Sequence, residues 1–190
     1  MTNEEKAEAL ALLASSSAAL AAAVEGVTEE QSQFQPEAGA WSIVQCVEHL
    51  NVTERAVLSK VRQQLSAGPP DRSRTPEVAG KERIILERVP FRVRKVPAPE
   101  VFQPCGESKA LFDAVADFQD ARRRTVEFAT DSTADLRGYF HDHFALKTLD
   151  VYQWLLMLAS HTQRHAAQIQ EIKSHPDYPA TATPRTIGLP

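Results

Sequence analysis

Prolines separate the helix-forming parts of this chain from one long stretch that cannot be a continuous helix. Seven of the 12 prolines lie between Gly68 and Gly106. A proline inside a helix removes a backbone hydrogen bond and clashes with the preceding turn. Apolar residues still recur in the stretch, so we expect a long ordered crossover that covers one end of the fold. Residues 81–88 are expected to form a short helix within it.

Four segments outside the crossover have the composition or the periodicity of helices. Alanine and leucine, both strong helix formers, dominate residues 3–25. In residues 42–66 the apolar side chains repeat at the spacing of one helix face, and Ser42 is the expected N-cap. Further helices are expected at 107–128 and from the N-cap Asp150 to just before Pro176, with 131–150 as a loop.

These elements predict an all-α fold. Four helices and one long crossover make a helix bundle, here residues 1–175, and the proline- and threonine-rich residues 176–190 are expected to be an irregular tail. A chain of 190 residues can bury the core of one such domain without disulfides. Its two cysteines, Cys46 and Cys105, indicate no disulfide framework.

Charge and composition argue against nucleic-acid and membrane partners. The formal net charge is −4, and the arginines at 122–124 project in three directions around a helix among acidic residues, so we expect a solvated face there. Residues 9–24 are uncharged but are mostly alanine and serine, so we expect no membrane span. The acidic first residues lack the basic start of a signal peptide. We therefore expect a cytoplasmic protein.

Three histidines are candidate metal ligands. His161 and His165 are four residues apart on one helix face, where two imidazoles can reach one divalent cation. His49 lies at the edge of the apolar arc of another helix and can face a cleft. A single inward histidine is more often a hydrogen-bonded core residue, and no H-E-x-x-H pattern is present. Three histidines on two helices would leave an open coordination position.

Residues near these histidines in the helices are not expected to be further metal ligands. Cys46, one turn before His49, is more readily a small buried apolar residue than a fourth ligand. Glu48 points about 100° away from His49, so we expect a surface or helix-contact role instead of a catalytic one. Gln168 is in line with His165 and is a candidate to hydrogen-bond a cofactor. Arg164, at the expected rim, is a candidate to meet an anionic thiol.

Several motifs resemble DinB/YfiT-like proteins along nearly the whole chain. The segment Trp41-Ser-Ile-Val-Gln-Cys-Val-Glu-His-Leu50 resembles the start of their second helix. The segment from His143 to Leu155 resembles the entry into their last helix, and Ser160-His-Thr-Gln-Arg-His-Ala-Ala-Gln-Ile169 resembles the two-histidine signature that follows. Ala98-Pro-Glu-Val-Phe-Gln-Pro104 is similar to the segment that leads into their third helix.

The resemblance implies an up-down-down-up four-helix bundle that is frequently a homodimer. It also implies a metal triad of His49, His161 and His165 that holds nickel, zinc or manganese, with zinc or nickel favoured. The family's histidine-proline-x-phenylalanine-glycine pattern is degraded here, because Phe144 replaces the proline and Lys147 the glycine.

Three functions fit these expectations. The first is a metal-dependent transferase for a small-molecule substrate, with a low-molecular-weight thiol such as bacillithiol, mycothiol or glutathione as cosubstrate in detoxification. The second is a hydrolase with hydroxide on the metal as nucleophile. The third is a non-catalytic metal-binding stress-response module, in which the metal supports the fold.

Overall fold

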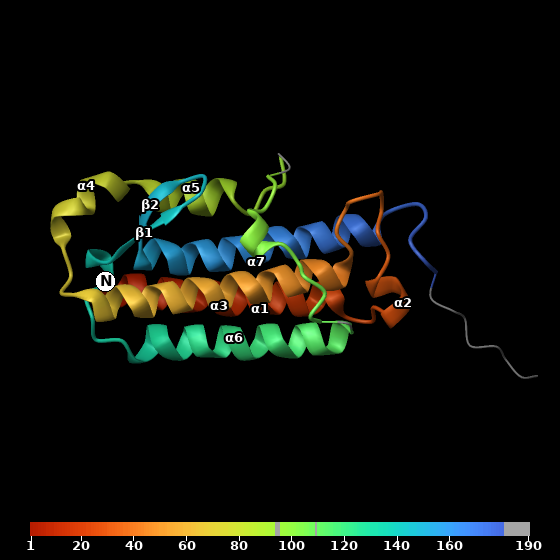
Figure 1. Cartoon of the computed structure of the whole chain (residues 1–190), viewed down its shortest axis with the longest axis horizontal. Coiled ribbons are helices and arrows are strands. Elements are labelled where there is room, and N and C mark those ends of the chain that lie inside the picture. The colour runs from red at the N-terminus through yellow and green to blue at the C-terminus, as the bar shows by residue number, and fades with distance from the viewer. Residues whose placement is uncertain (94–95, 109, 181–190) are drawn as a thin grey trace, which may run out of the picture.

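The computed structural model describes residues 1–93, 96–108 and 110–180. Four long helices lie side by side in it: α1 (Asn3–Val24), α3 (Ile43–Ala67), α6 (Leu111–Asp131) and α7 (Val151–Lys173) (Figure 1). This confirms the predicted four-helix bundle. Residues 181–190 of the predicted tail lie outside the described residues.

Contacts between helix ends show the up-down-down-up topology. Tyr152 donates to Glu8 at 2.6 Å near the starts of α7 and α1, and Lys173 donates to the carbonyl of Ala23 at 2.9 Å near their ends, so these helices are parallel. The chain just after α3 meets the chain just after α6, where Asp71 N donates to Gly138 O at 2.8 Å. The inner helices α3 and α6 are therefore parallel to each other and antiparallel to the outer pair.

Two of the helix starts are those that the sequence predicts. Ser42 caps α3 and accepts from Gln45 N, and Asp150 caps α7 and accepts from Gln153 N. In both cases the glutamine side chain accepts from the backbone N–H of the cap residue, which completes a reciprocal capping box. The second predicted helix and the last are confirmed to within two residues at each end.

The predicted start of the third helix at residue 107 is wrong, because α6 begins at Leu111. Ala110 offers no side-chain cap. The carboxylate of Glu29, on the short helix α2 (Glu29–Ser32), instead accepts from Leu111 N at 3.1 Å. The helix start is thus satisfied by a residue 82 positions away, which no local pattern could indicate.

The predicted loop at 131–150 contains structure that the sequence analysis missed. After the short 3-10 helix η3 (Leu136–Gly138), strands β1 (Phe140–His143) and β2 (Lys147–Asp150) form an antiparallel hairpin. Lys147 has a φ of 60°, in the left-handed region where glycine is favoured. The chain therefore keeps a turn there although lysine stands where the family pattern has glycine.

The crossover contains η1 (Arg72–Arg74), α4 (Thr75–Val78), α5 (Lys81–Arg88) and η2 (Glu100–Phe102). The predicted short helix at 81–88 is confirmed. The expectation that the crossover covers one end of the bundle is wrong, because α5 packs along α7 and η2 contacts α3. The fully buried Ile85 holds α5 in place. The crossover therefore covers the side of the bundle where α3 and α7 meet (Figure 1).

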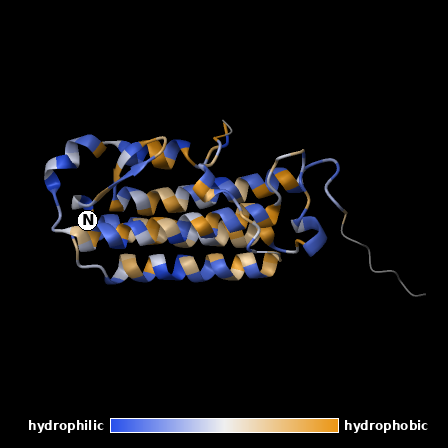
Figure 2. Cartoon of the chain, in the orientation of Figure 1, coloured by the Kyte–Doolittle hydropathy of each residue, from blue (hydrophilic) through white to orange (hydrophobic). Residues whose placement is uncertain are grey.

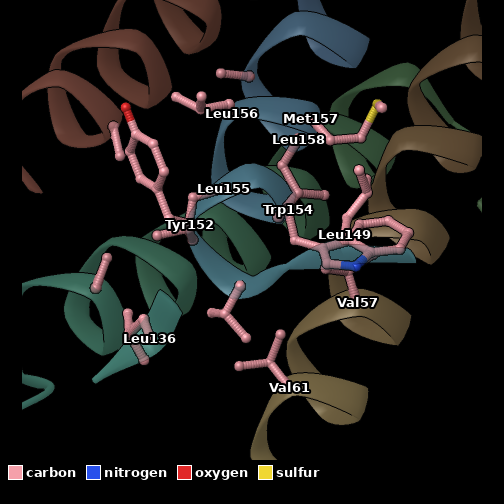
Figure 3. Packing of buried hydrophobic residues seen from close by; sticks show 14 of the residues in the cluster. Val57, Val61, Leu136, Leu149, Tyr152, Trp154, Leu155, Leu156, Met157 and Leu158 are labelled. Atoms are coloured by element: carbon pink, nitrogen blue, oxygen red, sulfur yellow. The ribbon is translucent and has the colours of Figure 1, made fainter. Parts of the chain in front are cut away.

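Hydrophobic residues form two clusters inside the bundle, and each long helix alternates hydrophobic and hydrophilic residues (Figure 2). One cluster surrounds the start of α7 and includes Leu155, Leu156 and Leu158 together with Val57, Val61 and Leu149 (Figure 3). The other joins α1, α3, α6 and the end of α7 around Phe118 and Ile169. All residues from Val151 to Ser160 are buried, so α7 is the central element of the core.

Helix α1 is long and apolar enough, by length and composition, to cross a membrane. The expectation that this segment is too weakly apolar is therefore wrong, although one such helix is weak evidence for a span. In the structure α1 packs along α7 and α6. Its buried residues recur every three or four positions, which is the pattern of a bundle helix: Ala9, Leu13, Ser16, Leu20 and Ala23.

A buried ion pair joins the helices between the two clusters. Arg122, expected on a solvated face, is 4% exposed and donates to both carboxylate oxygens of the buried Glu54, at 2.8 and 3.0 Å. It also donates to Leu13 O and Ser16 Oγ on α1 and to Thr162 Oγ1 on α7. The prediction for Arg122 was wrong because its partners come from three other helices. Arg123 and Arg124 are exposed.

We expect Arg122→Met to lower the free energy of unfolding by about 3–5 kcal/mol, because it leaves the Glu54 carboxylate buried without a countercharge. Urea denaturation monitored by circular dichroism measures this. The double variant Glu54→Leu with Arg122→Met should regain much of the loss. Arg123→Ala, at the exposed neighbouring position, should change the free energy of unfolding by less than about 0.5 kcal/mol. An equal loss in Arg122→Met and Arg123→Ala would contradict the role of Arg122 in a buried ion pair.

Candidate metal centre

The structure brings the three predicted histidines together. His161 Nε2 lies 3.2 Å from His49 Nε2 and 3.0 Å from His165 Nε2. Each histidine offers one ring nitrogen, and these three nitrogens all lie within 4.8 Å of one another, so the cluster could hold a metal ion. Two nitrogen ligands of a tetrahedral zinc, each at about 2.0–2.1 Å, are separated by about 3.3 Å. The observed separations are close to that value.

Hydrogen bonding fixes the tautomer of His49. Its Nδ1 lies 2.6 Å from the carbonyl oxygen of Phe102, which can only accept. Nδ1 therefore carries the proton and Nε2 presents a lone pair to the cluster. A histidine whose outer nitrogen donates to a carbonyl is the usual arrangement around a bound metal, because the bond orients the ring.

The three imidazoles cannot satisfy one another without a cation. The contact between His49 Nε2 and His161 Nε2 requires the proton to be on His161. The single N–H of His161 cannot also be directed at His165 Nε2, 3.0 Å away, and a protonated His161 Nε2 has no lone pair with which to accept from it. A divalent cation would accept all three lone pairs at once. The residues present therefore fit a bound metal.

Burial keeps the cluster uncharged. It lowers the pKa of His49, and it lowers the pKa of His161 and His165 well below the ordinary value of 6.5, with repulsion between the neighbouring rings as a further cause. Neutral imidazoles are the form that binds metals. Trp41 covers the cluster, with its ring 4.7 Å from that of His49 and 6.0 Å from that of His165.

The cluster opens into a large cavity between the bundle and the crossover. The cavity has a volume of about 2220 Å³, and its lining includes all three histidines, Trp41 and the crossover residue Phe102. The cation position is thus reachable by small molecules. The expectation that His49 faces a cleft is confirmed.

Arg164 and Gln168, the two predicted cofactor contacts, line the same cavity and bind the crossover. Arg164 donates to the carbonyl of Phe91 at 2.6 Å, and Gln168 accepts from Arg92 at 2.8 Å. Arg92 also pairs with Glu171 at 2.8 Å. These bonds hold the crossover against α7, and a role in cofactor binding stays a prediction.

Residues beside His49 behave differently from the ligands. Cys46 is fully buried, outside the histidine cluster, and burial raises the pKa of its thiol to about 12, which confirms it as an apolar core residue. Glu48, expected at the surface or a helix contact, is buried instead and accepts from the backbone N–H groups of Cys105 and Glu107 at 3.2 and 2.9 Å. It therefore anchors the chain that leads into α6.

The structure places His143, the histidine of the degraded family pattern, in the cavity wall. Its Nδ1 accepts from the backbone N–H groups of Ala145 and Leu146, both at 3.1 Å. Burial, with repulsion from His141, lowers its pKa to about 4. At neutral pH His143 is therefore neutral, with its proton on Nε2, which makes it a hydrogen-bond donor.

A mostly helical bundle with an open three-histidine cluster is the class of protein that this fold and site define. The chain belongs to the DinB superfamily, whose family model matches residues 8–169. It is 25% identical over 156 residues to the uncharacterized protein YuaE of Bacillus subtilis strain 168, covering 79% of this chain and 88% of that protein.

A solved structure confirms the fold. It is that of YfiT from Bacillus subtilis, described as a probable metal-dependent hydrolase with an unusual four-helix bundle topology. It matches with a TM-score of 0.56 and 17% sequence identity, over 91% of this chain and 88% of YfiT. At that identity the likeness establishes the fold alone.

We expect His161→Ala to abolish metal binding, because His161 Nε2 is the atom that contacts both other ligands. The wild-type protein, dialysed after loading with zinc, should retain about one ion per chain. Elemental analysis of the two proteins measures this. His175→Ala, a histidine outside the cluster, should retain the full content; full retention by His161→Ala would refute the site.

We expect the metal-free protein to lose stability as the pH falls below about 6.5. The unfolded chain protonates these histidines near that pH, whereas the folded chain holds their pKa values lower, so unfolding takes up protons. Stability should thus rise with pH up to about 6.5 and level off above it. Urea denaturation of chelator-treated protein between pH 5 and 8 measures the slope. His165→Asn should reduce that slope; an unchanged slope would contradict the interpretation.

Proposed function

We propose that this protein is a metal-dependent hydrolase of a small-molecule substrate, with zinc or nickel as the metal. The observation that carries the proposal is a cluster of three neutral imidazoles in the wall of an open cavity. Imidazole suits both cations. A divalent cation held by three neutral ligands keeps its full charge and lowers the pKa of a coordinated water toward about 7.

The residues of the chain would prepare the site in three ways. The carbonyl of Phe102 keeps the proton of His49 on Nδ1 and so directs Nε2 to the cation. Trp41 packs against His49 and His165 and shields one side of the cluster from water. His143 offers a neutral Nε2–H in the same cavity as a donor for a polar group of the substrate.

A thiol transferase is the second candidate, and the size of the cavity favours it. Small-molecule sites usually measure about 300–1,000 Å³, so a cavity of about 2220 Å³ has room for a thiol and a second substrate. However, Arg164 and Gln168 already bind the crossover. To bind an anionic thiol they would have to give up these bonds, whereas hydrolysis requires no such change.

We expect zinc- or nickel-loaded protein to hydrolyse at least one member of a panel of p-nitrophenyl carboxylate and phosphate esters without any added thiol. Release of p-nitrophenolate measures the rate. Chelation should remove the activity, and His161→Ala should lower kcat/KM by about a hundredfold or more because it removes a ligand. Phe112→Ser, at an exposed position of α6 outside the cavity, should keep the wild-type rate.

Two outcomes would contradict the hydrolase. Turnover that appears only when bacillithiol, mycothiol or glutathione is added would identify the transferase. Absence of turnover on every substrate, together with a steep loss of stability on chelation, would identify a non-catalytic protein whose metal supports the fold.

A further inference from the structure

Exposed hydrophobic side chains concentrate at the cavity. The described residues include seven exposed large hydrophobic side chains. Six of them line the cavity that contains the three histidines: Ile84, Phe91, Val93, Val96, Val101 and Phe144. The seventh, Phe112, lies on α6 outside it. Single exposed hydrophobic residues scattered over a surface are ordinary, whereas a group of them at one place marks a binding site.

These six residues, called the apolar rim here, come from separate parts of the chain. Most belong to the crossover, whose projecting part carries hydrophobic residues in Figure 2, and Phe144 belongs to the turn between β1 and β2. Val93 is 88% exposed, Val101 77% and Phe91 62%. No single amphipathic helix explains such an arrangement. What the six residues share is the cavity.

Two arginines that line the cavity already have partners within the protein. Arg92 pairs with Glu171, and Arg164 donates to the backbone of the crossover. The three histidines are neutral because burial depresses their pKa values. The surface that lines the cavity is more apolar than polar.

We infer that the cavity binds a substrate with an extended apolar group, such as an acyl or aryl chain, and that the apolar rim holds this group while the polar reacting group meets the three histidines. The reacting end rests on the proposed hydrolytic function. A small molecule is the occupant because the six rim residues and the three histidines line one cavity, and ligand sites are concave and mostly apolar.

The test uses the full-length protein loaded with cobalt(II) and a series of hydroxamates from acetohydroxamate to octanohydroxamate. Calorimetry measures each Kd, and the visible spectrum of cobalt reports coordination. A fully buried methylene strengthens binding about fourfold. We expect the Kd to fall at least about a hundredfold from the shortest to the longest chain, because six methylenes are added.

Variants locate the effect. Phe91→Ser and Val101→Ser should each weaken octanohydroxamate about fivefold or more and leave acetohydroxamate unchanged, because only the long chain reaches the rim. Phe112→Ser is the matched control, since it removes an exposed hydrophobic residue outside the cavity, and it should leave both ligands unchanged.

The outcomes separate this inference from the proposed function. Equal Kd values along the series, or equal losses in Phe112→Ser and Phe91→Ser, would overturn the apolar site even if cobalt coordination is seen. A chain-length effect that depends on the rim but leaves the cobalt spectrum unchanged would support the apolar site and reject the hydrolytic centre. If Phe91→Ser changed only the oligomeric state, the rim would be a contact between copies of the chain and the inference would be wrong.

Discussion

The buried ion pair between Arg122 and Glu54 aligns the helices on which the histidines depend. Glu54 lies five residues after His49 on α3, and Thr162, which also accepts from Arg122, follows His161 on α7. Because these helices run in opposite directions, one guanidinium that binds both of them, and α1 as well, fixes their relative position about one to two turns from the cluster. The geometry of the three imidazoles therefore follows from a charge pair that contacts none of them.

The crossover is positioned by residues adjacent in sequence to the ligands. Glu48 precedes His49 and holds the chain before α6, and Arg164 precedes His165 and holds the carbonyl of Phe91. Neighbouring residues of a helix point about 100° apart, so each ligand can face the cavity while its neighbour binds the segment that encloses it. The crossover returns one contact to the site, because the carbonyl of Phe102 fixes the tautomer of His49.

Features that depend on local spacing could be predicted from the sequence, and features that depend on distant partners could not. The helix starts at Ser42 and Asp150 follow from capping boxes within four residues. The start of α6 depends on Glu29, and the burial of Arg122 depends on residues from three other helices. In the site, the spacing of His161 and His165 indicated a shared face, and the family resemblance indicated His49 as the third ligand. The contact that joins His49 to them across 112 residues is made only by the fold. The hairpin was missed because its strands have only four residues each.

The two buried polar clusters of the bundle differ in whether they are complete. Arg122 has partners for each of its terminal nitrogens, so its cluster needs nothing more. In the histidine cluster, the ring nitrogens of His49 and His165 both lie next to His161 Nε2, and its single N–H can be directed at only one of them. An incompletely satisfied buried cluster destabilises a fold unless something binds to it, and such local conflicts are expected at functional sites. Both clusters join α3 to α7. The ion pair of Arg122 and Glu54 therefore holds the three histidines in place for the cation that would satisfy them.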